Sequence, residues 1–393
     1  MPITGATTQA VNGLTARWAG MSSGGTVFSA AGVWPLLAFL ADGAQGAARA
    51  ELARALGVPA EQAAAAAREL LAELADAKAL DAALGLWTKR TLEPREEWEA
   101  GLPTDAHGVL TGDPALDQQE MDAWAAKRTG GLIERMPVEV RDDTELVLAS
   151  ALALRTTWQR PFEARPVRPS TGPWQGRTLR GLHRRSVRPD RAGVATAPAG
   201  RVTEVKVLGD NGVDVHLLLG DEHMTPGQVL AAGAALLDGT CPVVRGSLLP
   251  LGPAGPGLRV EERPCADPRQ PTLEVTTAAF EMRAQHDLLD LHELFGLTAA
   301  RDGRQGHFPG ISASPLAVGS ARQSVLARFD ALGFEAAAVT AVAAAPGGPP
   351  PTPRYLSTVV TAAFDRPFGF LAVHRRTRLA LTAGWVAEPV PFH

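Results

Sequence analysis

The sequence predicts a mixed α+β fold. Helix patterns dominate the first half of the chain and strand patterns the second, so the elements do not alternate as they do around a parallel sheet. The chain has 393 residues, 45% of them hydrophobic, and can therefore bury a sizeable core. Length alone would suggest more than one domain, but the sequence contains no internal repeat.

Three stretches in the first half carry helix signals. Residues 30–56 have apolar positions at helical spacing, and the glycines at 43 and 46 separate one helix from the next. Residues 59–79 form the clearest amphipathic pattern, with a proline and a glutamate in the first turn, where helices accept them. A further helix is predicted over 117–136.

Strand patterns begin with residues 145–154, a run of strand length that is apolar on both faces. Such a run is typical of the middle of a buried sheet. The other strand candidates are residues 202–208, 213–219, 272–283, 324–329, 358–363 and 368–373.

Composition excludes several classes of partner. A net charge of -4 gives no reason to expect nucleic acid or an anionic membrane. Cys241 and Cys265 are too few for a disulfide framework or a thiolate metal cluster, and we expect both to be free. The N-terminus lacks a basic start followed by an apolar run, and no apolar run is long enough to span a membrane. We therefore expect a cytoplasmic protein, or one already trimmed.

Motifs of common enzyme sites are missing from the sequence. It contains no G-x-G-x-x-G or G-x-x-x-x-G-K-[ST] phosphate loop, no H-E-x-x-H zinc motif and no G-x-S-x-G nucleophile elbow. His286, His292 and Glu293 have the wrong spacing for one helical face, so solvated histidines are preferred to a metal site. We predict no catalytic residue, no metal and no cofactor. An unrelated α/β hydrolase is kept as a rival, which labelling by an active-site serine probe would support.

A run of small residues near the C-terminus is the most informative segment. From Phe334 to Ala345 the chain has no proline and alternates small side chains between two faces, and fully extended it would span roughly 40 Å. Small side chains would let such a segment slide between existing strands with little repacking. On composition alone an Ala-rich linker or a short helix is the simpler interpretation.

The wider sequence resembles the serpin family, in matches that run in order from about residue 15 to residue 389. Each match is weak alone, but their common order makes them strong together. They comprise Phe28-Ser29 followed by Gly43-Ala44-Gln45-Gly46, Trp124 with Thr129, Gly130 and Ile133, Trp158-Gln159-Arg160-Pro161-Phe162, the stretch FEMRAQHDLLDLHELFGLTAA, Phe308-Pro309-Gly310-Ile311-Ser312, Gly333-Phe334-Glu335-Ala336-Ala337-Ala338, and Phe364-Asp365-Arg366-Pro367-Phe368 with the strand pair after it.

The resemblance implies a fold and a mechanism. The fold would be one serpin domain over residues 1–393, with a large central β-sheet, two smaller sheets, about eight to nine helices and an exposed reactive-centre loop at about 331–357. The protein would be a monomeric inhibitor, not an enzyme. A serine protease would attack the loop and form an acyl-enzyme, and the cut loop would then insert into the central sheet and trap the protease.

The resemblance also assigns the residues of the loop. Counting from Gly333 by the family's usual spacing places the reactive bond at Gly347-Gly348. Its small flanks suit a subtilisin- or elastase-like protease, whereas cleavage at Arg354-Tyr355, the second choice, would suit a trypsin-like one. The hinge and inserting residues would be Gly333, Phe334, Glu335, Ala336, Ala337, Ala338, Val339 and Thr340.

Some positions depart from the family pattern. Phe334 stands where the family has its first small inserting residue, and forcing its ring between strands could cost roughly 1 to 3 kcal/mol unless a pocket receives it. A serpin-fold protein that no longer inhibits, serving as a binding or structural module, is therefore the alternative function. The family also has a central hydrogen-bonding cluster that governs opening of the large sheet, called here the sheet-opening cluster. Its positions in this sequence are assigned to Ser29, Ser150, Gln323 and Trp158, and this set departs from the family pattern. Ser150 and Gln323 replace the family's asparagine and histidine, so they could form only a different polar network with Ser29.

Six arginines form a local basic run. Some serpins bind polyanions through such clusters, but the run has no interleaved aromatic residues and no clean helical face. A solvated loop is therefore the preferred interpretation. The run comprises Arg177, Arg180, Arg184, Arg185, Arg188 and Arg191.

Overall fold

The structure is a computed structural model that describes residues 3–76, 80–104, 106–138, 140–141, 143–334 and 354–392. Within these residues it contains eight α-helices and three β-sheets, which confirms the predicted mixed α+β class. No helix among them is both long and apolar enough to cross a membrane. Cys241 and Cys265 are both free.

The central sheet holds the longest strands. Its order is β3-β2-β4-β16-β17-β5, and β15 pairs with the other edge of β16. Every residue of β4 is buried, as predicted for the run at 145–154. The strands are β2 (Leu80–Lys89), β3 (His107–Leu110), β4 (Leu146–Leu154), β5 (Thr156–Thr157), β15 (Phe280–Asp287), β16 (Val318–Phe329) and β17 (Gly333–Phe334).

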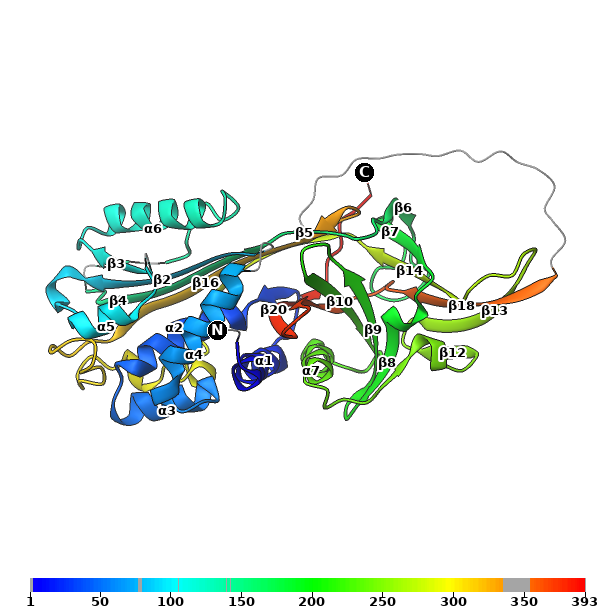
Figure 1. The fold of residues 1–393 in the computed structure, drawn as a ribbon. Helices are drawn as coiled ribbons and strands as arrows, with labels where there is room; N and C mark the ends of the chain where they lie inside the picture. Colours follow the sequence, from blue (N-terminus) through cyan, green and yellow to red (C-terminus); the bar gives the residue numbers. More distant parts are fainter. Residues whose placement is uncertain are drawn as a thin grey trace.

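Two further sheets lie beyond one end of the central sheet (Figure 1). The second sheet has the order β1 (Thr26–Phe28), β20 (Leu379–Val386), β19 (Phe368–His374), β10 (Val213–Gly220), β9 (Gly200–Leu208), β8 (Ala192–Ala197) and β11 (Val243–Arg245). The third has the order β12 (Gly252–Gly255), β13 (Leu258–Cys265), β18 (Tyr355–Ala363), β14 (Thr272–Ala278), β7 (Leu179–Ser186) and β6 (Glu163–Val167).

Helices cover both faces of the central sheet: α6 lies on one face and α2, α3 and α4 on the other (Figure 1). Twelve residues of α2, from Ala30 to Ala41, are buried, as expected for a helix that is apolar all round. The helices are α1 (Gly5–Gly20), α2 (Ala30–Asp42), α3 (Gly46–Leu56), α4 (Ala60–Asp76), α5 (Glu96–Gly101), α6 (Pro114–Arg128), α7 (Pro226–Leu237) and α8 (His292–Phe295). Single 3₁₀ turns cover Arg90–Leu92, Pro189–Arg191, Gly246–Leu248 and Ala299–Arg301.

Helix α6 corrects the prediction over 117–136. The helix begins earlier because Asp113 caps it, accepting hydrogen bonds from two backbone N–H groups of the first turn. It ends at Arg128 because Gly130 and Gly131 both take the left-handed conformation that stops a helix. The apolar residues beyond them, which extended the helical pattern, instead pack as a loop against the outer face of the central sheet.

The predicted strand at 272–283 is two strands. The chain leaves β14 of the third sheet and enters β15 of the central sheet at Ala279. There the N–H of Ala279 donates to the carbonyl of Arg180, and its carbonyl accepts from Val390, so this residue belongs to neither ladder. The candidates at 202–208, 213–219, 324–329, 358–363 and 368–373 lie within β9, β10, β16, β18 and β19 and are confirmed.

Candidate functional site

The chain enters the predicted loop from a two-residue strand that is already part of the central sheet. After β16 it turns back, and β17 pairs antiparallel with β16 on one side and with β5 on the other. Phe334 faces Phe329 in one ladder and Thr156 in the other. The position of Gly333 has no room for a side chain, because a Cβ there would come within 2.3 Å of the carbonyl oxygen of Thr156.

Phe334 sits in an apolar pocket, contrary to the expected obstruction. Its side chain is 1% exposed, and its ring centroid lies 6.1 Å from that of Phe370. The pocket exists because β4 pairs with β16 only between Val318 and Leu326 of β16, and β17 occupies the space where their ladder has ended. The penalty predicted for a bulky residue at this position therefore does not arise.

The turn before β17 is held by the segment that follows β5. The indole N–H of Trp158 donates to the carbonyl of Asp330 at 2.9 Å, and the Trp158 backbone N–H donates to Leu332. The backbone N–H of Phe162 donates to the carbonyl of Ala331. Trp158 therefore belongs to the hinge at residues 330–334, and the structure does not bring it together with the other residues assigned to the sheet-opening cluster.

Ser29 and Gln323 of that predicted cluster do meet. The Gln323 amide spans the backbone of Ser29, accepting from its N–H at 2.9 Å and donating to its carbonyl at 2.8 Å. The Ser29 hydroxyl donates to the carbonyl of Leu381 at 2.6 Å and caps α2 through the N–H of Gly32. These bonds tie β16 to the start of α2 and to β20.

Ser150 lies opposite Gln323 across the seam between β4 and β16, but it does not join the network. Its hydroxyl is buried and has no hydrogen-bond partner among the described residues. A Cβ on Gly32 would lie 2.6 Å from this hydroxyl, so a side chain there would require Ser150 to move. At the positions of Ser150 and Gln323, strands β4 and β16 are therefore joined by their backbone hydrogen bonds. The side-chain hydrogen bonds of Gln323 go to Ser29 and do not reach β4.

The chain leaves the predicted loop into β18, which is paired along both edges. Its residues Tyr355 to Ala362 pair antiparallel with β13, and Val359 to Ala363 pair parallel with β14. The N–H of Arg354 donates to the carbonyl of Cys265 at the start of this pairing. The hairpin of β12 and β13 was missed from the sequence, because its prolines and glycines favour a loop.

The other loop residues lie outside the described part of the chain. These are Glu335, Ala336, Ala337, Ala338, Val339, Thr340, Gly347 and Gly348.

The basic run at 177–191 is mostly not a solvated loop. Three of its members belong to β7, where residues alternate between an inner and an outer face. Arg180 lies 3.8 Å from the buried carboxylate of Asp330, Arg185 is exposed near Glu274, and Arg184 is 5% exposed. The sequence pattern did not indicate this strand, because arginine occupies both of its faces.

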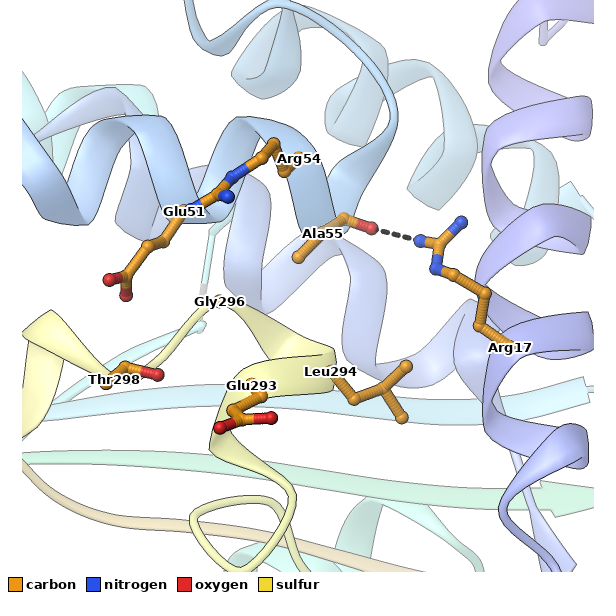
Figure 2. Close-up of a pocket in the computed structure, with 8 residues that line it drawn as sticks. All are labelled: Arg17, Glu51, Arg54, Ala55, Glu293, Leu294, Gly296 and Thr298. Atoms are coloured by element: carbon orange, nitrogen blue, oxygen red, sulfur yellow. Dashed lines mark hydrogen bonds between the residues drawn. The ribbon is translucent and has the colours of Figure 1, made fainter.

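A cavity of about 420 Å³ lies away from the hinge, between α3 and the segment around α8 (Figure 2). Charged side chains of Glu51, Arg54 and Glu293 line it, and the guanidinium of Arg17 donates to the carbonyl of Ala55 at 2.5 Å. The nearby His292 hydrogen-bonds to Thr298. No group of three or more potential metal ligands occurs within the described ranges.

Comparisons with known proteins identify relatives of this chain. The family model described as serpin (serine protease inhibitor) matches residues 11–171 and 264–389. A relative from Oryza sativa subsp. japonica named serpin-Z6A is 34% identical over 149 residues, which are 35% of this chain and 38% of the rice protein. The chain thus spans well under half the length of that curated relative.

Solved structures with the same fold cover almost the whole chain. The native-state structure of the thermophilic serpin tengpin matches with a TM-score of 0.74 and 15% identity, over 98% of this chain and 94% of that one. A complex of thyroxine-binding globulin with thyroxine matches with a TM-score of 0.71 and 16% identity, over 98% and 99% of the two chains.

Proposed function

This chain belongs to the serpin family, and we propose that it inhibits a serine protease by acting as a suicide substrate. The protease serine attacks a carbonyl of the loop, the peptide bond breaks, and the amine leaves with the proton that the protease histidine supplies. The loop carbonyl is then esterified to the protease. Insertion of the cut loop into the central sheet carries the acyl-enzyme away before water can hydrolyse the ester.

The observation that carries this proposal is strand β17. Gly333 and Phe334 already form the first two residues of a strand between the two halves of the central sheet. For that strand to continue between β4 and β16, the hydrogen bonds of the parallel β4–β16 ladder must break, beginning with the pair nearest the hinge. The inserted strand would run antiparallel to β16, as β17 does.

The free energy of insertion is large enough to drive the trap. Around ten new backbone hydrogen bonds at about 0.5–1.5 kcal/mol each give on the order of 10 kcal/mol. Burial of alternate apolar side chains adds to this value. The parallel ladder that must be broken is, per residue, slightly weaker than the antiparallel pairing that replaces it.

The position of β18 favours Gly347-Gly348 over Arg354-Tyr355 as the reactive bond. Tyr355 is the first residue of β18 and is paired with Cys265, and Arg354 is hydrogen-bonded to the same residue. A protease would have to release Arg354 from this hydrogen bond and Tyr355 from the sheet before it could cut between them. Gly347-Gly348 has small flanks, which suit the shallow primary pocket of a subtilisin- or elastase-like enzyme.

Incubation with subtilisin and, separately, trypsin tests the proposal. We expect a complex with subtilisin that survives denaturing gel electrophoresis, and a released C-terminal peptide that begins at Gly348 by mass spectrometry. Cleavage of the whole sample without any stable complex would contradict inhibition of these enzymes and would favour the non-inhibitory alternative. A peptide that begins at Tyr355 would contradict the assigned bond.

A further inference from the structure

Arg184 on β7 is a buried cation without an acidic partner. Arg184 is 5% exposed, and its guanidinium lies over the ring of Phe162, 4.4 Å from the ring centroid. One Nη donates to the carbonyl of Arg160 at 3.1 Å, whereas the buried Nε has no hydrogen-bond partner among the described residues. A buried charge is costly unless it is paired, so this arrangement calls for a counter-ion.

Two further arginines, Arg160 and Arg191, lie close enough for their charges to act on Arg184. Burial, together with the positive charges of Arg191 and Arg160, lowers the pKa of Arg184 to about 10. The charges of Arg160 and Arg188 likewise lower the pKa of Arg191, in addition to its burial. These groups come from separate parts of the fold: β7, the segment between β5 and β6, and the turn Pro189–Arg191.

Carboxylates near this cluster are already engaged. Asp214 is the acid whose charge acts on Arg191, but Arg375 binds it with two nitrogens, at 2.9 Å and 2.6 Å. Asp190 accepts a hydrogen bond from the backbone N–H of Ser247. Across the described ranges, no carboxylate lies within ion-pair distance of the guanidinium of Arg160, Arg184 or Arg191.

We propose that Arg160, Arg184 and Arg191 bind a small, doubly charged oxyanion of the phosphate or sulfate type. Guanidinium groups match the geometry of such oxyanions and form charge-assisted hydrogen bonds with them. Arg184 is buried, whereas Arg160 and Arg191 are more exposed. This arrangement fits one compact anion better than an extended polyanion. This inference does not depend on the proposed inhibition.

The proposed site adjoins the hinge. Arg160 lies between Trp158 and Phe162, whose backbone N–H groups hold Leu332 and Ala331. An anion that fixes Arg160 therefore also fixes the segment on which the hinge rests. Because binding to the folded state stabilises it by mass action, the anion is expected to raise the thermal midpoint of the intact protein.

Calorimetric titration and thermal melts of the full chain test the proposal, with sodium phosphate and sodium sulfate compared against sodium chloride at equal ionic strength. We expect saturable binding of the two divalent anions and a rise in thermal midpoint that chloride does not produce. Arg160→Gln and Arg191→Gln should each weaken binding at least tenfold, since a hydrogen bond to a charged group is worth about 1.5–3 kcal/mol. Both changes affect more exposed side chains, so the fold is expected to persist.

Arg185→Gln is the matched control. It removes the same charge one residue away, on the outer face of the same strand, where Arg185 lies near Glu274. Its affinity for phosphate should equal that of the wild type. Absence of saturable binding, equal stabilisation by chloride, or equal weakening by Arg185→Gln would overturn the proposal. Binding of heparin without binding of phosphate or sulfate would also overturn it, because the cluster would then serve a sulfated polymer.

Discussion

The two ends of the segment from 335 to 353 are attached to the molecule very differently. On its N-terminal side, β17 has only two residues. Phe334 pairs with β16, and both Gly333 and Phe334 pair with β5. On its C-terminal side, β18 has nine residues and is paired with β13 along one edge and β14 along the other. In the proposed mechanism the first attachment lengthens residue by residue, whereas the second cannot be released without breaking two ladders.

This difference matches what the proposed mechanism requires of each end. The N-terminal side must travel into the central sheet, where β17 occupies the hinge end of the boundary between β4 and β16 and a backbone ladder joins the two strands beyond it. The C-terminal side must stay in place after the bond is cut. The hairpin of β12 and β13 contributes to that, because it covers an edge of β18 that would otherwise be free.

The largest effect should come from a charge on the inserting face of the loop. In a strand that continues β17, side chains alternate, so residue 338 shares the buried face of Phe334 and residue 337 points to the opposite face. Ala338→Arg should lower the yield of protease complex at least tenfold, because insertion would bury an unpaired cation. Ala337→Arg, the neighbouring change on the other face, should leave most of the yield. Equal loss in both variants would contradict insertion in this register.

A smaller contrast is expected between two buried phenylalanines that face each other. Phe329→Ala in the long strand β16 should cost about 3–5 kcal/mol in the apparent free energy of unfolding, measured by chemical denaturation. Phe334→Ala should cost less than about half as much, because a two-residue strand can leave the sheet while the rest stays folded. Equal losses would show that β17 is as firmly held as β16.

At the other end of the segment, Val360→Ala tests the anchoring of β18. Val360 is fully buried and pairs with Val260 and Leu273. Its truncation should cost about 2 kcal/mol of stability. The loss should be the same in the intact and the cleaved protein, since β18 is expected to stay in place. A loss confined to one form would indicate that the anchor moves.

The smallest effect is expected at the hinge turn. Trp158→Phe keeps an aromatic ring against Phe329 but removes the indole N–H that donates to the carbonyl of Asp330. The change should cost about 1 kcal/mol, the usual worth of one buried hydrogen bond. Trp124→Phe, a change at a tryptophan on α6 far from the hinge, serves as the comparison. The loss of stability in Trp158→Phe should be accompanied by faster proteolysis of the hinge. Trp124→Phe should not make proteolysis of the hinge faster.

Much of the scaffold was predictable because its elements carry their own patterns. The apolar residues of β4 and α2 indicate buried elements without knowledge of their neighbours. The break at Ala279 was not predictable, because a chain that passes straight from one sheet to another keeps its strand pattern throughout. The end of α6 was missed because the apolar loop beyond it continues to face the same sheet.

Only part of the candidate site was predictable from the sequence. The order of short motifs suggested that Ser29 and Gln323 could share a network, and the two residues are hydrogen-bonded in the structure. It could not show that Phe334 has a pocket, because that pocket is formed by Phe329 and Phe370 from distant parts of the chain. Nor could it show that Arg184 is buried, since a charged side chain in a run of arginines gives no sign of facing inward.

The most direct test of the account is a thermal melt of the protein before and after a single cut in the loop. If the cut loop inserts as a continuation of β17, the gain on the order of 10 kcal/mol estimated above should raise the thermal midpoint by at least about 15 °C. The cut form of Ala338→Arg should not show this rise. A cut wild-type protein that melts at the same temperature as the intact one would contradict insertion, and with it the proposed mechanism of inhibition.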